Sequence, residues 1–332
     1  MSDFLWPAGA ATGVGSLPGT DIAESQRMVF GELPELPHLA ELPERGPGAD
    51  MIGRSAGFLV GVPVQIYVGR WQVAPRPGRD MRRTADLIER DLDQLTELGD
   101  GFAGTLKLQS AGPWTLAAGL DLPIGGRMLR DPGAVRDLTD SLAEGLRRHV
   151  DDVHKRLPLA TLLLQLDEPS LQTVLLGRVP TESGLGAYRP VDNADAATAL
   201  RTVIEAAGVP VVVHSCDGGV PLQLLRDAGA AAVSLDLSLL TDLDPVGEAI
   251  EAGLGLFAGA VSTRPTVDGR VPDYKQIAER VSGLWSRLGF PAERLPRQVV
   301  ITPACGLAGA SESYARAVLK ACRDAGRSLA EV

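Results

Sequence analysis

The chain has 332 residues, of which 45% are hydrophobic and 22% charged, the balance of an ordinary globular protein. Its formal net charge of −10 argues against a surface for nucleic acid or for an anionic membrane. The N-terminus lacks the basic start and apolar run of a secretion signal, and no apolar stretch approaches the length of a membrane span. Three cysteines are too few for a disulfide framework and suit reduced thiols, so we expect a cytoplasmic location.

Short apolar runs alternate along the chain with longer amphipathic segments. Most of these runs are aliphatic on both faces, which is typical of parallel strands covered by helices. We expect strands at residues 12–16, 63–68, 105–108, 161–166, 211–214, 232–236, 254–260 and 299–302.

The segments between the predicted strands carry apolar residues with the spacing of one helix face. The clearest of these helices are expected at residues 81–98, 132–156, 194–207, 221–228, 274–288 and 311–325. Eight strands alternating with helices predict an α/β protein with the (β/α)8 barrel architecture, formed as a single domain by residues 1–332. A doubly wound open sheet is the alternative.

Three longer segments are expected as loop insertions, at about residues 31–50, 69–80 and 177–190. They are rich in proline and glycine. In a (β/α)8 barrel, the loops at the carboxyl ends of the strands build the active site. These segments are therefore expected either to cover a site or to be plain solvated connections.

A histidine and a cysteine stand two positions apart where the fifth predicted strand ends, at His214 and Cys216. Residues at this spacing in a strand point to the same side. Cys305 follows the last predicted strand. An imidazole and two thiolates form a zinc site if a carboxylate or a water completes the tetrahedron. A lone cysteine is usually a small buried apolar residue, the role we expect for Cys322 within a predicted helix.

The candidate for a fourth ligand is Asp236, at the end of the sixth predicted strand. An acid at the end of an apolar strand is costly unless it is paired or coordinates a metal. The alternative is that Asp236 caps a helix or is solvated.

Two further groups lie at predicted strand ends. Asp167 and Glu168 follow the fourth strand, where adjacent acids suit the binding of an ammonium group or acid–base chemistry. Either acid could instead cap the helix that follows. Val14, Gly15 and Ser16 end the first strand, where backbone N–H groups and a hydroxyl can hold a carboxylate. The glycine spacing there differs from the dinucleotide-binding pattern.

Six motifs occur in a fixed order along the chain: GVGSLPGT, SAGPWTLAAG, QLDEPSL, VHSCDGG, VSLDLS and TPACGL. Over residues 13–306 the sequence thereby resembles the catalytic C-terminal barrel of cobalamin-independent methionine synthase. This family lies within the barrel group that includes uroporphyrinogen decarboxylase. The resemblance implies the short, single-barrel core form of the family.

The resemblance implies a zinc-dependent S-methyltransferase that methylates the thiol of homocysteine to give methionine, with a methylfolate or a methylcorrinoid as donor. The zinc ligands it implies are His214, Cys216, Asp236 and Cys305. The homocysteine-binding positions it implies are Val14, Gly15, Ser16 and Asp167, with Glu168 beside them. Asp167, His214, Cys216 and Cys305 are the residues expected to carry the reaction.

The sequence departs from the family pattern in two informative places. Asp236 stands where the family has a glutamate, and Thr263 and Arg264 occupy the segment that holds the family's proton-donor histidine. A methylcorrinoid, carried by a partner protein, is therefore an alternative donor. The alternative functions are alkyl transfer to another small thiol, a zinc-binding homologue without methyltransferase activity, and a metal-free decarboxylase-like barrel.

Overall fold

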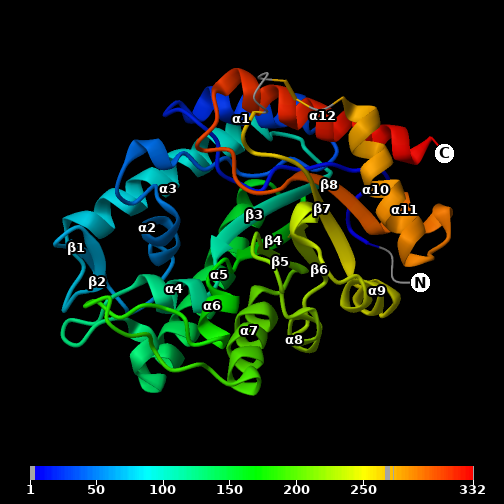
Figure 1. The fold of residues 1–332 in the computed structure, drawn as a ribbon. Helices are drawn as coiled ribbons and strands as arrows, with labels where there is room; N and C mark the ends of the chain where they lie inside the picture. Colours follow the sequence, from blue (N-terminus) through cyan, green and yellow to red (C-terminus); the bar gives the residue numbers. More distant parts are fainter. Residues whose placement is uncertain (1–3, 266–269, 272, 332) are drawn as a thin grey trace.

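A parallel sheet of six strands forms the centre of the protein, shown in Figure 1 as a computed structural model described over residues 4–265, 270–271 and 273–331. The strands lie side by side in chain order: β3 (Thr105–Ala111), β4 (Thr161–Asp167), β5 (Val211–Ser215), β6 (Ala232–Asp236), β7 (Gly255–Val261) and β8 (Val299–Pro303). All six occur where strands were predicted. Because the strands are parallel, their carboxyl ends meet at one edge of the sheet.

Helices surround the sheet (Figure 1). The longer ones are α3 (Arg79–Leu98), α5 (Pro132–Arg156), α7 (Asn193–Ala207), α8 (Leu222–Asp227), α9 (Asp244–Glu251), α10 (Tyr274–Leu288) and α12 (Glu312–Ala330). Two of them, α5 and α10, have the predicted bounds, and four others differ from prediction only at their ends. The prediction lacked α9 and five other helices, α1 (Ile22–Glu32), α2 (Met51–Ala56), α4 (Pro113–Gly119), α6 (Leu171–Leu175) and α11 (Leu295–Gln298). Within the described residues, no helix has the length and apolar character needed to cross a membrane.

The N-terminal segments lie along both edges of the sheet. The predicted strand at residues 12–16 forms no ladder, but Ala11 bridges to Ile301 of β8 in parallel. His38 bridges in the same way to Lys107 of β3, and Ser16 bridges to Glu41. Each edge strand of the sheet therefore has an irregular neighbour, and the two neighbours meet each other near the carboxyl ends.

The strand predicted at residues 63–68 exists, but its expected place in the parallel sheet is wrong. β1 (Val64–Tyr67) pairs with β2 (Arg70–Val73) as an antiparallel hairpin outside the main sheet. The turn residues Val68 and Gly69 both have positive φ, 48° and 74°, a conformation that suits a tight hairpin. Residues 69–80, expected as a loop, thus contain β2 and the start of α3.

The other two expected insertions are mostly irregular. Residues 31–50 include the end of α1 and the short 3-10 helix η1 (Pro43–Arg45). Residues 177–190 form a loop with one antiparallel bridge, between Pro180 and Ala187. This loop packs on the segment after β3, because the hydroxyl of Tyr188 accepts a hydrogen bond from the backbone N–H of Arg127 at 2.9 Å.

The inner face of the sheet is arranged in layers. An apolar layer consists of Trp6, Ala10, Leu36, Leu163, Val212, Ala232, Phe257 and Val300. Two positions further along the strands, on the same face, the side chains are polar, and these include Gln165, His214, Ser234 and Thr302. The apolar layer therefore closes the interior toward the amino ends of the strands, and the polar layer lies toward their carboxyl ends.

A buried ion cluster fixes the segment beside β3. Asp91 of α3 accepts hydrogen bonds from both terminal nitrogens of Arg45, at 2.7 and 2.8 Å, and is also paired with Arg54 of α2. Arg54 lies 3.3 Å from Glu41 as well. The side chains of Asp91 and Arg54 are almost completely buried. This cluster ties α3 to the segment that bridges to Ser16.

We expect Asp91→Ala to lower the free energy of unfolding by about 3–5 kcal/mol, because it leaves the buried Arg54 guanidinium without its main partner. The matched control is Asp93→Ala on the same helix, which removes an exposed pair with Arg156 and should cost about 0–1 kcal/mol. Urea unfolding of both variants measures the difference. Equal losses in the two variants would contradict a stabilising role for the buried cluster.

Candidate functional site

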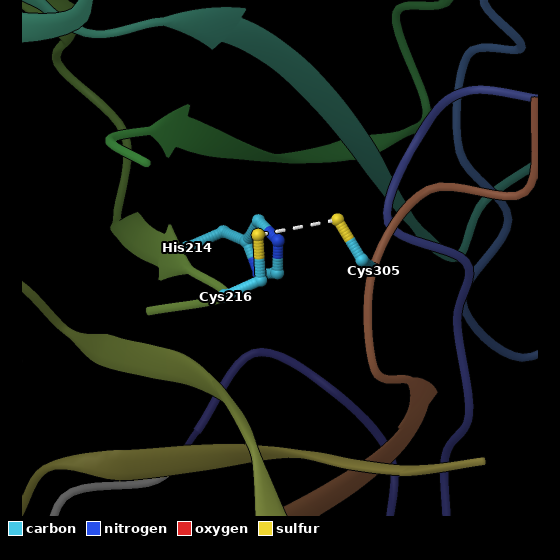
Figure 2. A group of neighbouring side chains, drawn as sticks. All are labelled: His214, Cys216 and Cys305. Atoms are coloured by element: carbon cyan, nitrogen blue, oxygen red, sulfur yellow. Dashed lines mark hydrogen bonds between the residues drawn. The ribbon is translucent and has the colours of Figure 1, made fainter. Parts of the chain in front are cut away.

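Three side chains converge at the carboxyl ends of β5 and β8, as Figure 2 shows. His214 lies near the end of β5, Cys216 follows that strand, and Cys305 lies two residues beyond β8. The sulfur atoms of Cys216 and Cys305 are 3.3 Å apart. The potential ligand atoms of all three residues lie within 4.8 Å of one another. The structure thus brings together the three residues expected to form a metal site.

His214 is held with one ring nitrogen free. Its Nδ1 lies 2.9 Å from the hydroxyl oxygen of Ser234 on the neighbouring strand β6. Its Nε2 is buried and has no hydrogen-bond partner among the described residues. A metal-binding histidine typically uses one nitrogen for the metal and the other for an orienting hydrogen bond. The ring therefore has the arrangement of a ligand.

The two cysteines affect each other's protonation. The contact with Cys216 lowers the pKa of Cys305 below its ordinary value, and His214 adds to this effect. The same contact and burial raise the pKa of Cys216. The pair therefore loses a first proton readily and resists losing the second, since two thiolates this close repel each other. A bound cation would remove that resistance.

The donor set fits zinc. Two sulfur atoms and an imidazole nitrogen around a common point are the ligands that zinc takes in proteins, and a tetrahedral site has room for one more. The third cysteine, Cys322, is fully buried in α12, as expected of a structural residue.

Asp236 lies at the end of β6, where its carboxylate accepts hydrogen bonds from a residue close by in the sequence. Its Oδ1 accepts hydrogen bonds from the backbone N–H and the hydroxyl of Ser238, at 2.8 and 2.7 Å. It thereby caps the short 3-10 helix η3 (Leu237–Leu239). Among the described residues, the group with converging ligand atoms contains His214, Cys216 and Cys305 without Asp236. A role for Asp236 as a metal ligand stays a prediction.

The two adjacent acids after β4 differ in their surroundings. Both oxygens of Glu168 accept hydrogen bonds from the first turn of α4: Oε1 from the backbone N–H of Trp114, and Oε2 from the N–H and hydroxyl of Thr115. Burial raises the pKa of Glu168 to about 7 despite these bonds. Glu168 therefore serves as a buried cap for α4, and direct contact with a substrate stays untested.

Asp167 ends β4 beside His214 of β5, its partner in the strand register. Its Oδ1 accepts a hydrogen bond of 2.7 Å from the side-chain amide of Gln165. Burial raises the pKa of Asp167, while the nearby charges of His214 and Lys107 oppose that shift. Asp167 is thus a buried carboxylate next to the candidate metal-binding group, with a second oxygen that can meet a ligand.

The segment of Val14, Gly15 and Ser16 lies against the loop that carries Cys305. The backbone N–H of Leu307 donates to the carbonyl of Ser16 at 2.8 Å. A Cβ atom on Gly306 would lie only 2.1 Å from the hydroxyl oxygen of Ser16, so a larger residue there would displace this hydroxyl. The predicted substrate segment and the cysteine pair therefore share one corner of the site.

Sequence reasoning missed four polar side chains nearby, Glu41, Lys107, Gln109 and Gln165. Glu41 lies on the irregular segment beside β3, and burial raises its pKa to about 7. The other three are buried on β3 and β4. A signal was present, because Lys107 and Gln109, and likewise Gln165 and Asp167, alternate with apolar residues. This alternation places them on the inner face.

Solved structures share this fold, among them the following two. A B12-independent methionine synthase from Shewanella sp. W3-18-1, in complex with selenomethionine, has a TM-score of 0.64 at 12% sequence identity, with 98% of each chain covered. A methyltransferase from Methanosarcina mazei has a TM-score of 0.57 at 15% identity, with coverage of 98% of this chain and 94% of that one. At these identities the likeness establishes the fold alone. None of the curated proteins matches the sequence.

The family model described as "Cobalamin-independent synthase, Catalytic domain" matches residues 101–328, which is more than half of the chain. The matched region contains β3 to β8 and all three residues of the group that could hold a metal. The chain therefore belongs to the cobalamin-independent synthase family, whose catalytic domain it matches, and is a methyltransferase.

Proposed function

We propose that this protein transfers a methyl group to the thiol of homocysteine, giving methionine, in a zinc-dependent reaction. The observation that carries the proposal is the convergence of His214, Cys216 and Cys305 beside a buried carboxylate. Membership of the cobalamin-independent synthase family supports it. The similar Shewanella structure, a methionine synthase in complex with selenomethionine, points to the same substrate class.

The chemistry begins with the protonation state of the acceptor. A free thiol has a pKa near ~8.5, and only its thiolate is strongly nucleophilic. When bound, zinc supplies the charge that deprotonates a coordinated thiol. His214, Cys216 and Cys305 would hold the ion, with Asp236 as the proposed fourth ligand. Asp236 would have to loosen its hydrogen bonds to Ser238 to reach it.

The remaining groups would position the amino acid. The carboxylate of Asp167, next to His214, would bind the ammonium group of homocysteine. The backbone at Val14 and Gly15 and the hydroxyl of Ser16 would bind its carboxylate. Glu168 would contribute by fixing the end of β4 against α4. Holding the thiol in line with a methyl donor is the main contribution such a site makes to the rate.

The methyl donor in this proposal is a methylfolate or a methylcorrinoid, the latter carried by a partner protein. Thr263 and Arg264 occupy the segment where the family's donor histidine is expected, which favours a donor that needs no protonation. The hydroxyl of Tyr314 donates to the carbonyls of Ser262 and Arg264, both at 3.0 Å, and holds this segment in place. The same departure supports the alternative of a zinc-binding homologue without methyltransferase activity. Alkyl transfer to another small thiol is the other alternative.

We further propose that the sheet is part of a complete (β/α)8 barrel in a single domain. The isolated bridges support this, because Ala11 adjoins β8, His38 adjoins β3, and Ser16 adjoins Glu41. The two irregular segments would then be the first two strands. We also place the protein in the cytoplasm, since zinc binding requires Cys216 and Cys305 to be reduced.

We expect the purified, reduced protein to contain about one zinc ion per chain and to lose it in Cys216→Ser and Cys305→Ser. Cys322→Ala is the matched control and should retain zinc, because Cys322 is buried in α12. Elemental analysis after removal of free metal measures the content. Zinc retained in both ligand variants, or none in the wild type, would refute the proposed site.

Asp236→Asn separates the two roles of that residue. An asparagine still accepts the hydrogen bonds from Ser238 but is a poor zinc ligand. If Asp236 binds zinc, the substitution should weaken zinc affinity at least about 10-fold, the loss typical of even an outer-shell partner. Competition with a chelator gives the affinity. Unchanged affinity with unchanged thermal stability would show that Asp236 only caps η3.

Methyl transfer to homocysteine is best tested with methylcobalamin and methyltetrahydrofolate in parallel. We expect methionine to form from at least one donor, and Cys305→Ser to lower the rate at least about 100-fold because it removes a ligand of the catalytic metal. Cys322→Ala should keep the wild-type rate. An unaffected rate in Cys305→Ser would refute the proposal that the reaction depends on zinc held by Cys305. Zinc-loaded protein that uses neither donor would favour the inactive homologue.

A further inference from the structure

One of the chain's four lysines is buried inside the protein. Lys107 lies on β3, facing the interior, whereas Lys155, Lys275 and Lys320 are exposed. Burying an ammonium group is costly unless its protons are all hydrogen-bonded. The apolar layer just beneath shows that this interior also accepts apolar side chains. An apolar side chain would fill this position as well, so we expect the charge of Lys107 to have a role of its own.

The ammonium group of Lys107 has three acceptors. Its Nζ donates to the carbonyl of Val14 at 2.9 Å, to Oε1 of Gln165 at 2.8 Å and to Oε1 of Gln109 at 3.3 Å. Val14 belongs to the segment proposed to bind the substrate carboxylate. The lysine thus reaches across from β3 to that segment and to β4.

Gln165 continues this connection. Its Nε2 donates to the carbonyl of Val14 at 2.8 Å and to Oδ1 of Asp167 at 2.7 Å. Lys107 and Gln165 therefore share the Val14 carbonyl as acceptor, and Gln165 adds the carboxylate proposed to bind the substrate ammonium. Two segments that are far apart in the sequence meet through these two side chains.

The glutamine amide is oriented from both of its ends. An ammonium group can only donate, so Oε1 of Gln165 faces Lys107. The carbonyl of Val14 and the carboxylate of Asp167 can only accept, so Nε2 faces them. Without the lysine, Oε1 would lose its donor and the glutamine would be held from one end only. Lys107 thus acts on Asp167 by holding Gln165 in place.

We propose that Lys107 and Gln165 form a positioning pair that sets the distance and orientation between the two halves of the homocysteine site, Asp167 and residues 14–16. The inference rests on the proposed function. The pair lies outside the group of His214, Cys216 and Cys305, so its role is amino-acid recognition rather than metal binding.

The test compares two thiols on the zinc-loaded protein by isothermal titration calorimetry. L-homocysteine carries the ammonium and carboxylate groups, and 1-propanethiol lacks both. In Lys107→Met, homocysteine should bind about 10- to 100-fold more weakly, the cost of a misplaced hydrogen bond to a charged group. Binding of 1-propanethiol and zinc content should stay at the wild-type level.

Two further variants keep the test decisive. Gln165→Met should give the same selective loss and replaces Lys107→Met if that variant does not fold. Lys155→Met makes the same substitution at an exposed position of α5 and should bind both thiols like the wild type.

The outcomes are distinct. Equal weakening of both thiols would show general damage and overturn the positioning role, as would unchanged binding of homocysteine. Wild-type protein that holds zinc but binds neither thiol would instead refute the proposed function, and the inference would fall with it.

Discussion

The alternation of side chains along parallel strands governs the construction of this site. Leu163, Gln165 and Asp167 follow one another at every second position of β4 and face the interior together. Val212 and His214 do the same on β5. The earlier positions along each strand carry the apolar side chains that close the interior, and the later positions carry polar groups toward the carboxyl edge. The apolar layer and the polar layer therefore both follow from the alternation of side chains along the strands.

Many groups in the polar layer have a partner. Lys107, Gln165 and Asp167 satisfy one another and the carbonyl of Val14. The exceptions are informative, since Nε2 of both His38 and His214 and the hydroxyls of Thr12 and Thr302 are buried without a partner among the described residues. Unsatisfied buried polar atoms are rare and call for a ligand, a water or a metal. For His214, the two neighbouring sulfurs support the metal of the proposed site.

The sequence was sufficient to identify three residues that converge, His214, Cys216 and Cys305, but not their surroundings. The two-residue spacing of His214 and Cys216 depends only on strand geometry, and Cys305 needed only the end of β8. Local pattern identifies an element but not its partner, which is why residues 63–68 were correctly a strand and wrongly part of the parallel sheet. The segments beside β3 and β8 make single bridges and no ladder, and the sequence pattern predicted a strand only for the one beside β8. The cap formed by Glu168 depends on where α4 begins, which no spacing reveals.

The candidate metal-binding group and the polar network come from different parts of the fold. The candidate metal-binding group belongs to β5 and β8, with Ser234 of β6 beside His214. The polar network belongs to β3, β4 and the N-terminal segment. They share little beyond the adjacency of Asp167 to His214 and the packing of Ser16 on Gly306. In the proposed function, thiol activation and recognition of the rest of the acceptor therefore fall to separate groups. On that proposal, a change in the β3–β4 network alters which thiol is bound and leaves the sulfur and nitrogen donors in place.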